Sequence, residues 1–286
     1  MNKAVLALAL AATFGAQAAY LAEETNEVVI TAEEGLLGSA DSAPNPSDLT
    51  QVNSFVFGTI DNDGTLKGMV GLAGQYSEGN NFMGLIEHGT ATKNNSVGKK
   101  DQNSRLRYFQ VLDTDMSGVP QVGFSVDYMK GWEKTNGFGS DLVALGGIAK
   151  VTTPWDALSI FPNVAYVTGE GKTKESGSKG KIDVSGYQLN IFGSLALGES
   201  GEYIVVQPQF MHLDGKSKVN GQKLDGKLDA NVFKVKTGYG QPISTDGKWW
   251  VEVSHTYTRT NMEVKQTQFS EKDNDHKFEF GVSYYF

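Results

Sequence analysis

Histidine is the side chain best suited to acid–base chemistry near neutral pH, and the chain has four of them. His88 stands two positions before Thr90, and His255 stands between Ser254 and Thr256. A hydroxyl beside a histidine is an arrangement that nucleophilic hydrolases use. Neither site carries a further recognisable motif, and adjacent residues of an extended strand point to opposite faces, which separates Ser254 from His255.

A second chemical pattern is charge placed inside apolar runs. VFKVKTGY, residues 232–239, alternates Lys234 and Lys236 with Phe233 and Val235. Because successive side chains of a strand point to opposite sides, the two lysines share one face and the apolar residues share the other.

The elements that carry these residues are predicted to be strands. Cysteine is absent, which excludes disulfide frameworks and thiolate metal sites. After the first 20 residues no apolar run approaches the roughly 20 residues that a membrane-spanning helix needs. Segments that favour β structure, bounded by Gly, Asn, Asp, Ser or Pro, are predicted at 51–60, 66–77, 82–92, 104–114, 119–132, 140–152, 158–169, 183–198, 202–214, 228–242, 248–262 and 276–286.

The connections between these segments alternate in length. Those at 78–80, 114–118, 152–157, 197–202 and 242–248 are short, whereas those at 92–103, 132–140, 169–183, 214–226 and 261–275 are long and hydrophilic; only the first, 61–64, breaks the rule. A soluble sandwich has no reason to keep this parity, but transmembrane barrels have short turns on one side and long loops on the other. We therefore predict an all-β protein, a single transmembrane antiparallel β-barrel of about 12 strands over 51–286, with short periplasmic turns and long extracellular loops.

Aromatic residues follow the same parity. Those at strand ends on the predicted periplasmic side are Trp155, Tyr203, Tyr239, Trp249, Trp250, Tyr284 and Phe286, and those toward the other rim are Trp132 and Tyr257. Two girdles at the membrane interfaces are predicted from this sorting.

The last residues, HKFEFGVSYYF, alternate apolar Phe278, Phe280, Val282, Tyr284 and Phe286 with other residues, among them Gly281. This ending resembles the carboxy-terminal signature of Gram-negative outer-membrane β-barrel proteins. The resemblance implies a location in the cell outer membrane, with lipid and lipopolysaccharide as neighbours. It also implies that the barrel-assembly machinery recognises this strand, which then closes against the first one.

The first 50 residues are predicted to lie outside the barrel wall. Lys3, an apolar stretch over 4–14, and Ala16 and Ala18 predict a signal peptide over residues 1–18. Residues 19–50 hold seven acidic residues and no Lys or Arg, nearly all of the formal net charge of -8, and are interpreted as an acidic periplasmic leader or a lumen plug. No basic stripe indicates nucleic acid as a partner.

Twelve strands enclose more space than the eight that side chains can fill, and less than the 16 to 18 of an open porin. The residues predicted to line this narrow pore are Lys67, Glu87, Arg105, Arg107, Asp127, Lys234, Lys236 and Glu252. An Arg or Lys on the lipid face near mid-bilayer would cost about 2 to 4 kcal/mol, which favours the inward placement. Two interpretations stay open: a porin-like channel for passive diffusion of small polar solutes of unknown identity, or charges that pair across a filled lumen.

Other functions are weaker interpretations of the same sequence. Asp113 and Asp115 resemble a carboxylate dyad but fall in a predicted periplasmic turn, and His212 with Asp214 falls at the outer rim. We predict no enzyme, with no catalytic residue, no metal site and no cofactor. The alternatives are a structural or surface-recognition protein, whose loops contact lipopolysaccharide, a host or a phage, and an outer-membrane lipid hydrolase.

Overall fold

The computed structural model describes residues 54–94, 100–132, 138–175, 178–198, 201–265 and 269–286. In these ranges the chain forms twelve strands: β1 (Phe55–Asp61), β2 (Thr65–Ser77), β3 (Asn80–Ala91), β4 (Gln102–Asp113), β5 (Gln121–Gly131), β6 (Phe138–Lys150), β7 (Leu158–Glu175), β8 (Ser178–Ala196), β9 (Tyr203–Val219), β10 (Gln222–Pro242), β11 (Trp249–Lys265) and β12 (Phe269–Tyr285). The predicted signal peptide and leader lie outside the described residues. No helix in the described ranges is long and apolar enough to cross a membrane.

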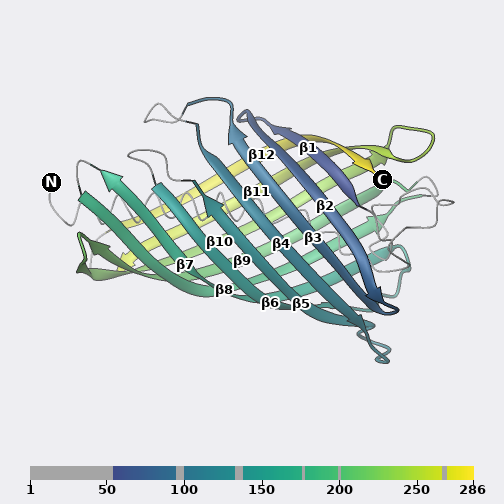
Figure 1. Cartoon of the computed structure of the whole chain (residues 1–286), viewed down its shortest axis with the longest axis horizontal. Coiled ribbons are helices and arrows are strands. Elements are labelled where there is room, and N and C mark those ends of the chain that lie inside the picture. Colours follow the sequence, from purple (N-terminus) through teal and green to yellow (C-terminus); the bar gives the residue numbers. More distant parts are fainter. Residues whose placement is uncertain (1–53, 95–99, 133–137, 176–177, 199–200, 266–268) are drawn as a thin grey trace.

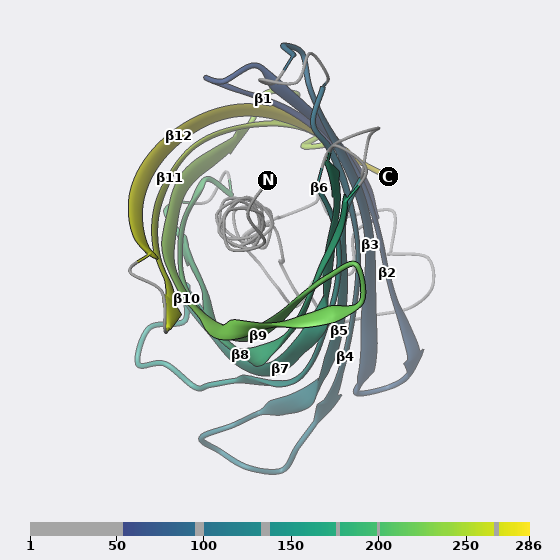
Figure 2. The same cartoon turned by 90° about the vertical axis from the view of Figure 1, so that its left-hand side faces the viewer.

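The strands form one closed antiparallel barrel in which each strand pairs with its neighbours in sequence (Figures 1 and 2). The ring closes where β1 pairs with β12, from Phe55 opposite Tyr285 to Asp61 opposite Glu279. Closure leaves no unpaired sheet edge, which is the condition for crossing a bilayer with strands. The predicted twelve-stranded antiparallel barrel is confirmed.

The second half of the barrel wall is longer than the first. Strands β7 to β12 have 17 to 21 residues, and β1 to β6 have 7 to 13. The extra length comes from segments that the sequence predicts as loops, since β9 and β10 are separated only by Asn220 and Gly221 in left-handed backbone conformations. Two residues with positive φ suit a tight hairpin turn, so the hydrophilic segment 214–226 continues the sheet instead of leaving it.

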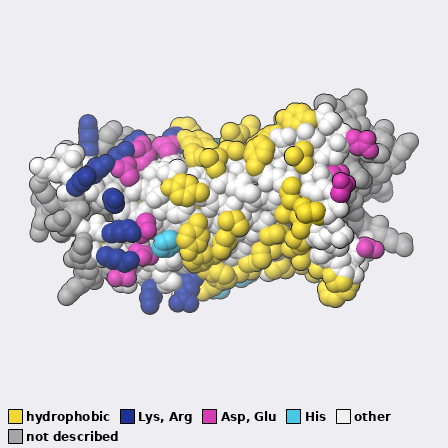
Figure 3. Space-filling view, turned by 90° about the horizontal axis from the view of Figure 1, so that it is seen from below, with side chains coloured by type: hydrophobic (Ala, Val, Ile, Leu, Met, Phe, Trp, Pro, Cys, Tyr) yellow, Lys and Arg dark blue, Asp and Glu magenta, His cyan; other side chains and the backbone are white. Residues whose placement is uncertain are grey.

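The outer surface carries an apolar band, with Lys and Arg side chains gathered beyond one end of it and Asp and Glu side chains beyond both ends (Figure 3). Leu189, Phe233 and Phe280 belong to the band and are 42%, 42% and 49% exposed. Exposed apolar side chains over this area mark a surface that lies against lipid. We call the end of the barrel with the short turns the periplasmic end and the end with the Lys and Arg side chains the extracellular end.

The aromatic residues follow the girdle prediction only in part. Trp155 and Trp249 are exposed, at 66% and 46%, as residues of an interface girdle would be. Tyr203 and Trp250 instead lie inside the barrel, where their rings are 5.9 Å apart. Trp250 follows Trp249 in the same strand, so the pleat turns one of the two inward, and their assignment to one girdle was wrong.

Candidate functional site: the inner wall of the barrel

The inner wall has three layers, and β9 shows all of them in turn. From the periplasmic end its inward residues are apolar (Tyr203 and Val205), then amides (Gln207 and Gln209), then apolar again (Met211 and Leu213), and all are buried. The inward residues of this strand therefore form one polar layer between two apolar ones. We call these layers the periplasmic apolar layer, the polar belt and the extracellular apolar layer.

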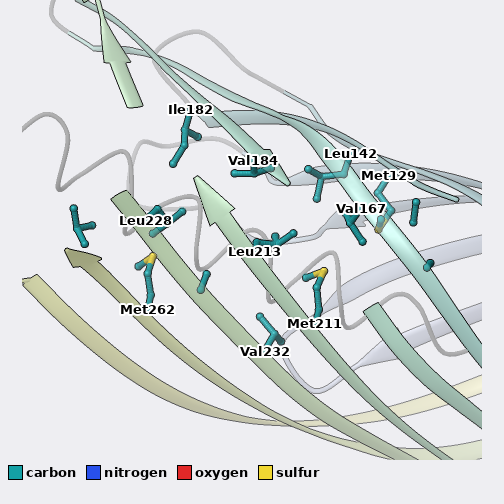
Figure 4. Close-up of a cluster of buried hydrophobic side chains, with 14 residues drawn as sticks. Met129, Leu142, Val167, Ile182, Val184, Met211, Leu213, Leu228, Val232 and Met262 are labelled. Atoms are coloured by element: carbon teal, nitrogen blue, oxygen red, sulfur yellow. The ribbon is translucent and has the colours of Figure 1, made fainter. Parts of the chain in front are cut away.

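Three clusters of buried residues form the two apolar layers. The periplasmic apolar layer consists of Met69, Met83, Leu85, Phe109, Val111, Ile148, Phe161, Phe192, Tyr203, Val205 and Trp250. The extracellular apolar layer consists of Met129, Leu142, Ala144, Ala165, Val167, Ile182, Val184, Met211, Leu213, Leu228, Ala230, Val232, Met262 and Val264, many of which Figure 4 shows.

Arginine–carboxylate pairs form the polar belt on the wall of β3, β4 and β5. Arg105 donates from Nε to Asp127 Oδ1 at 2.7 Å and from Nη2 to Asp127 Oδ2, a two-point ion pair. Arg107 pairs with Glu87 in the same belt. Two-point pairs of this kind fix the position of both groups, because the planar guanidinium matches the carboxylate.

Lysine–carboxylate pairs form the belt on the wall of β10, β11, β12, β1 and β2. Lys67 Nζ lies 2.5 Å from Glu279 Oε1, and Lys236 Nζ lies 3.0 Å from Glu252 Oε1. Lys277 Nζ lies 3.7 Å from Asp61 Oδ2.

Side-chain amides complete the belt between these two walls. Asn163 donates to Ser125 Oγ at 2.9 Å, Asn190 donates to Asn163 Oδ1 at 2.8 Å, and Gln188 donates to Asn190 Oδ1 at 3.1 Å. This chain links β5, β7 and β8 with neutral groups that can both donate and accept.

The structure places all eight predicted pore-lining residues on the inner face, where they form Arg105–Asp127, Arg107–Glu87 and Lys236–Glu252 pairs, while Lys67 pairs with Glu279 and Lys234 is fully buried. Their role in conduction stays a prediction. Sequence reasoning missed Asp61, Lys277, Glu279 and the amides. Lys277 and Glu279 could have been found, because they alternate with the apolar residues of the last strand.

The candidate hydrolase pairs do not assemble as the sequence spacing suggests. His88 Nδ1 lies 2.9 Å from Ser104 Oγ on the neighbouring strand. His255 Nε2 lies 3.1 Å from His276 Nδ1 on the outer side of the wall, whereas Ser254 is buried on the inner side. Among the described residues around His88 and His255, a nucleophile, a base and an orienting acid are therefore not brought together.

Asp113 has another partner than Asp115, whereas His212 does lie near Asp214. Asp113 Oδ1 accepts a hydrogen bond of 2.9 Å from Gln121. His212 Nδ1 lies 2.9 Å from Asn231 Oδ1 and 3.9 Å from Asp229 Oδ1, and His212 Nε2 lies 4.0 Å from Asp214 Oδ2. Within the described residues, no group of three or more His, Cys, Asp or Glu side chains is placed to hold a metal ion.

The closed barrel, its outer apolar band and its polar belt define the class of this molecule. It has the fold of an outer-membrane β-barrel, as the carboxy-terminal resemblance implies. No protein-family model and no curated protein sequence matches the chain.

Solved structures give the particular likenesses. The COG4313 outer-membrane channel from Pseudomonas putida F1 is similar over 88% of this chain and 100% of its own, with 10% identity and a TM-score of 0.55. The KdgM porin is similar over 82% of this chain and 99% of its own, with 10% identity and a TM-score of 0.41. The alcaligin outer-membrane receptor FauA from Bordetella pertussis matches over 82% of this chain at 10% identity and a TM-score of 0.38, and this chain spans 41% of that receptor.

Proposed function

We propose that this chain is a narrow outer-membrane channel for passive diffusion of small polar solutes. The observation that supports it is the polar belt, a ring of charged and amide side chains that faces the interior at the height of the outer apolar band. On β10, for example, Lys234 and Lys236 face inward between the outward residues Phe233 and Val235. Such groups in the middle of a bilayer favour a water-filled path.

The composition of the belt suggests modest selectivity. Its basic side chains are Lys67, Arg105, Arg107, Lys234, Lys236 and Lys277, and its acidic side chains are Asp61, Glu87, Asp127, Glu252 and Glu279. Because most basic groups have an acidic partner, the field along the axis is weak. We expect a channel that admits both signs of ion with a slight preference for anions.

Planar-bilayer recording of the refolded mature chain tests the proposal. We expect steady unit conductance from the chain that begins at Ala19, or from a variant that lacks residues 19–50 if that leader acts as a plug. Conductance in neither form would overturn the channel and favour the surface-recognition or lipid-hydrolase alternatives. Empty bilayers and a heat-unfolded sample are the controls.

A row of ion pairs on the outer face of β7, β8, β9 and β10 supports a second proposal, contact with lipopolysaccharide. Lys181 pairs with Glu170 at 2.5 Å, Lys218 with Asp183 at 2.7 Å and Lys227 with Asp214 at 2.7 Å, all beyond the apolar band. This is the height of charged head groups, where lysine can exchange its acidic partner for a lipid phosphate. Co-purified lipopolysaccharide should fall when Lys181, Lys218 and Lys227 are changed to Gln, and an unchanged amount would argue against the contact.

A further inference from the structure

The extracellular end of the barrel has the opposite polarity to the part inside the band. On β9, inward Met211 and Leu213 alternate with outward His212 and Asp214, and on β10 inward Val232 follows outward Asn231. Beyond the band the wall is therefore polar outside and apolar inside, which is the arrangement of a soluble barrel.

An apolar inner wall in a barrel of this size calls for an apolar occupant. Eight strands with such an interior already hold one small ligand in soluble barrels, and a ring of twelve strands is wider. The fourteen side chains of the extracellular apolar layer are aliphatic or thioether groups, with no aromatic ring among them. Flexible Met129, Met211 and Met262 can adapt to a chain of varied shape, as methionines do at promiscuous binding surfaces.

Basic and amide groups lie directly beneath this apolar layer. Met129 on β5 is the register partner of Arg105 on β4, so an apolar and a cationic side chain are neighbours on the inner wall. On β10, Lys234 is the next inward residue after Val232, and it is fully buried. The border between layers therefore places two positive charges at the lower edge of an apolar surface.

Arg105 retains a donor toward the cavity at this border. Its Nε and Nη2 donate to Asp127. Its Nη1 has no hydrogen-bond partner in the described part of the chain, and water does not reach it, because the residue is only 3% exposed. A small cavity here is lined by Arg105 and Asp127, by Ala144 and Ala165 of the extracellular apolar layer, and by side chains of the polar belt, among them Asn163 and Gln188. A buried donor without an acceptor is costly, and an acceptor atom on a ligand would satisfy it.

We propose that the extracellular half of the lumen binds an amphipathic anion, a medium-chain aliphatic carboxylate. The alkyl chain lies along the extracellular apolar layer, and the carboxylate accepts from Arg105 Nη1 and lies near the Lys234 ammonium. Asp127 opposes the carboxylate, but its charge is already engaged by Arg105. The inference rests on the proposed function only in that the ligand enters through the same lumen.

Calorimetric titration of the mature chain in lipid nanodiscs tests the proposal with hexanoate, octanoate and decanoate, after subtraction of the signal from empty nanodiscs. We expect affinity to rise by up to about fourfold for each methylene that becomes buried. Octyltrimethylammonium, which has the same chain and the opposite charge, should bind at least tenfold more weakly than octanoate.

Paired variants locate the site. Met211→Gln with Val232→Thr makes the inner wall polar with little change of volume and should flatten the dependence on chain length. Val206→Thr is the control, because Val206 lies on the outer face of β9 and is 47% exposed. This variant should keep the dependence of affinity on chain length. Both variants must first show the compact, heat-modifiable mobility of a folded barrel, and Val232→Thr alone serves if the double variant does not fold.

The results separate the two proposals. No dependence on chain length, a dependence that survives in the inner-wall variant, or equal binding of the ammonium compound would overturn the inference. If the chain conducts ions without binding the carboxylates, the binding site is overturned and the channel proposal stands. If the chain binds the carboxylates but does not conduct ions, the channel proposal is overturned and the binding site stands.

Discussion

Lys67 and Glu279 form an ion pair across the seam where the barrel closes. Lys67 lies on β2 and Glu279 on β12, with β1 between them, and their charged atoms are 2.5 Å apart. The two side chains are only 18% and 7% exposed, so the pair joins residues from opposite ends of the sequence inside the wall. It adds a side-chain link to a seam whose backbone pairing is only seven residues long on β1.

Glu279→Gln should weaken this seam. The substitution removes the carboxylate that compensates a largely buried ammonium, and breaking a buried pair in this way costs about 3 kcal/mol. The free energy of unfolding by urea in lipid vesicles measures the loss. Asp229→Asn, which removes the partner of the exposed Lys265, is the matched control and should cost under about 1 kcal/mol. Equal losses for both variants would show that Lys67–Glu279 is not a structural link.

Asp127→Asn should shift ion selectivity toward anions. The change leaves the charge of Arg105 on the inner wall without its acidic partner, so the lumen becomes more positive. The reversal potential in a potassium chloride gradient measures the shift. Asp214→Asn on the outer face is the control and should leave the reversal potential unchanged. A shift in the opposite direction, or none, would remove Asp127 from the conduction path.

Gly186→Ala should destabilise the barrel by about 1 to 3 kcal/mol, the usual cost of overpacking. A Cβ atom at Gly186 would lie 1.8 Å from the backbone oxygen of His212, so β8 and β9 would have to separate. Gly68→Ala is the matched control, because nothing lies within 4 Å of the added atom. Unfolding in urea compares the two, and equal stability would show that the strands adjust freely at Gly186.

Phe286→Ala should reduce insertion into the outer membrane in cells, because the terminal aromatic belongs to the resembled assembly signature. Phe286 is 62% exposed and contributes little to packing, so refolding of the purified variant into vesicles should be unchanged. The folded fraction in outer-membrane preparations, seen by heat-modifiable mobility, measures the effect. Trp155→Ala, a similarly exposed aromatic in a periplasmic turn, is the control. Equal insertion of the two variants would remove the assembly role.

Much of the wall could be predicted from the sequence, because a strand with one apolar face has apolar residues at every second position of its own segment. The segment predicted at 66–77 is β2, and the one predicted at 158–169 is the first part of β7. The inward placement of Lys234 and Lys236 follows from the same alternation with Phe233 and Val235.

The extent of the strands and the partners of the charges could not be predicted in this way. The segment 169–183 has the composition of a loop, yet its residues 169–175 belong to β7 and its residues 178–183 belong to β8, where Lys181 and Glu170 form a cross-strand ion pair. Trp250 is of the residue type found in aromatic girdles, yet the pleat directs its side chain inward, where Nε1 donates to the backbone oxygen of Gly247 at 2.6 Å. These outcomes depend on register, which a single segment does not contain.

The amino-acid sequence by itself determined that this chain makes about twelve strands with one lipid-facing side. Each strand shows the alternation of apolar and polar residues within its own segment, and each turn contains its own strand-ending residues. Only the tertiary structure decided that Arg105 meets Asp127, that Lys67 meets Glu279, and that a polar belt lies between two apolar layers. The physical reason is that strand register sets which side chains share a height in the barrel, and register is fixed when all twelve strands pair and the ring closes.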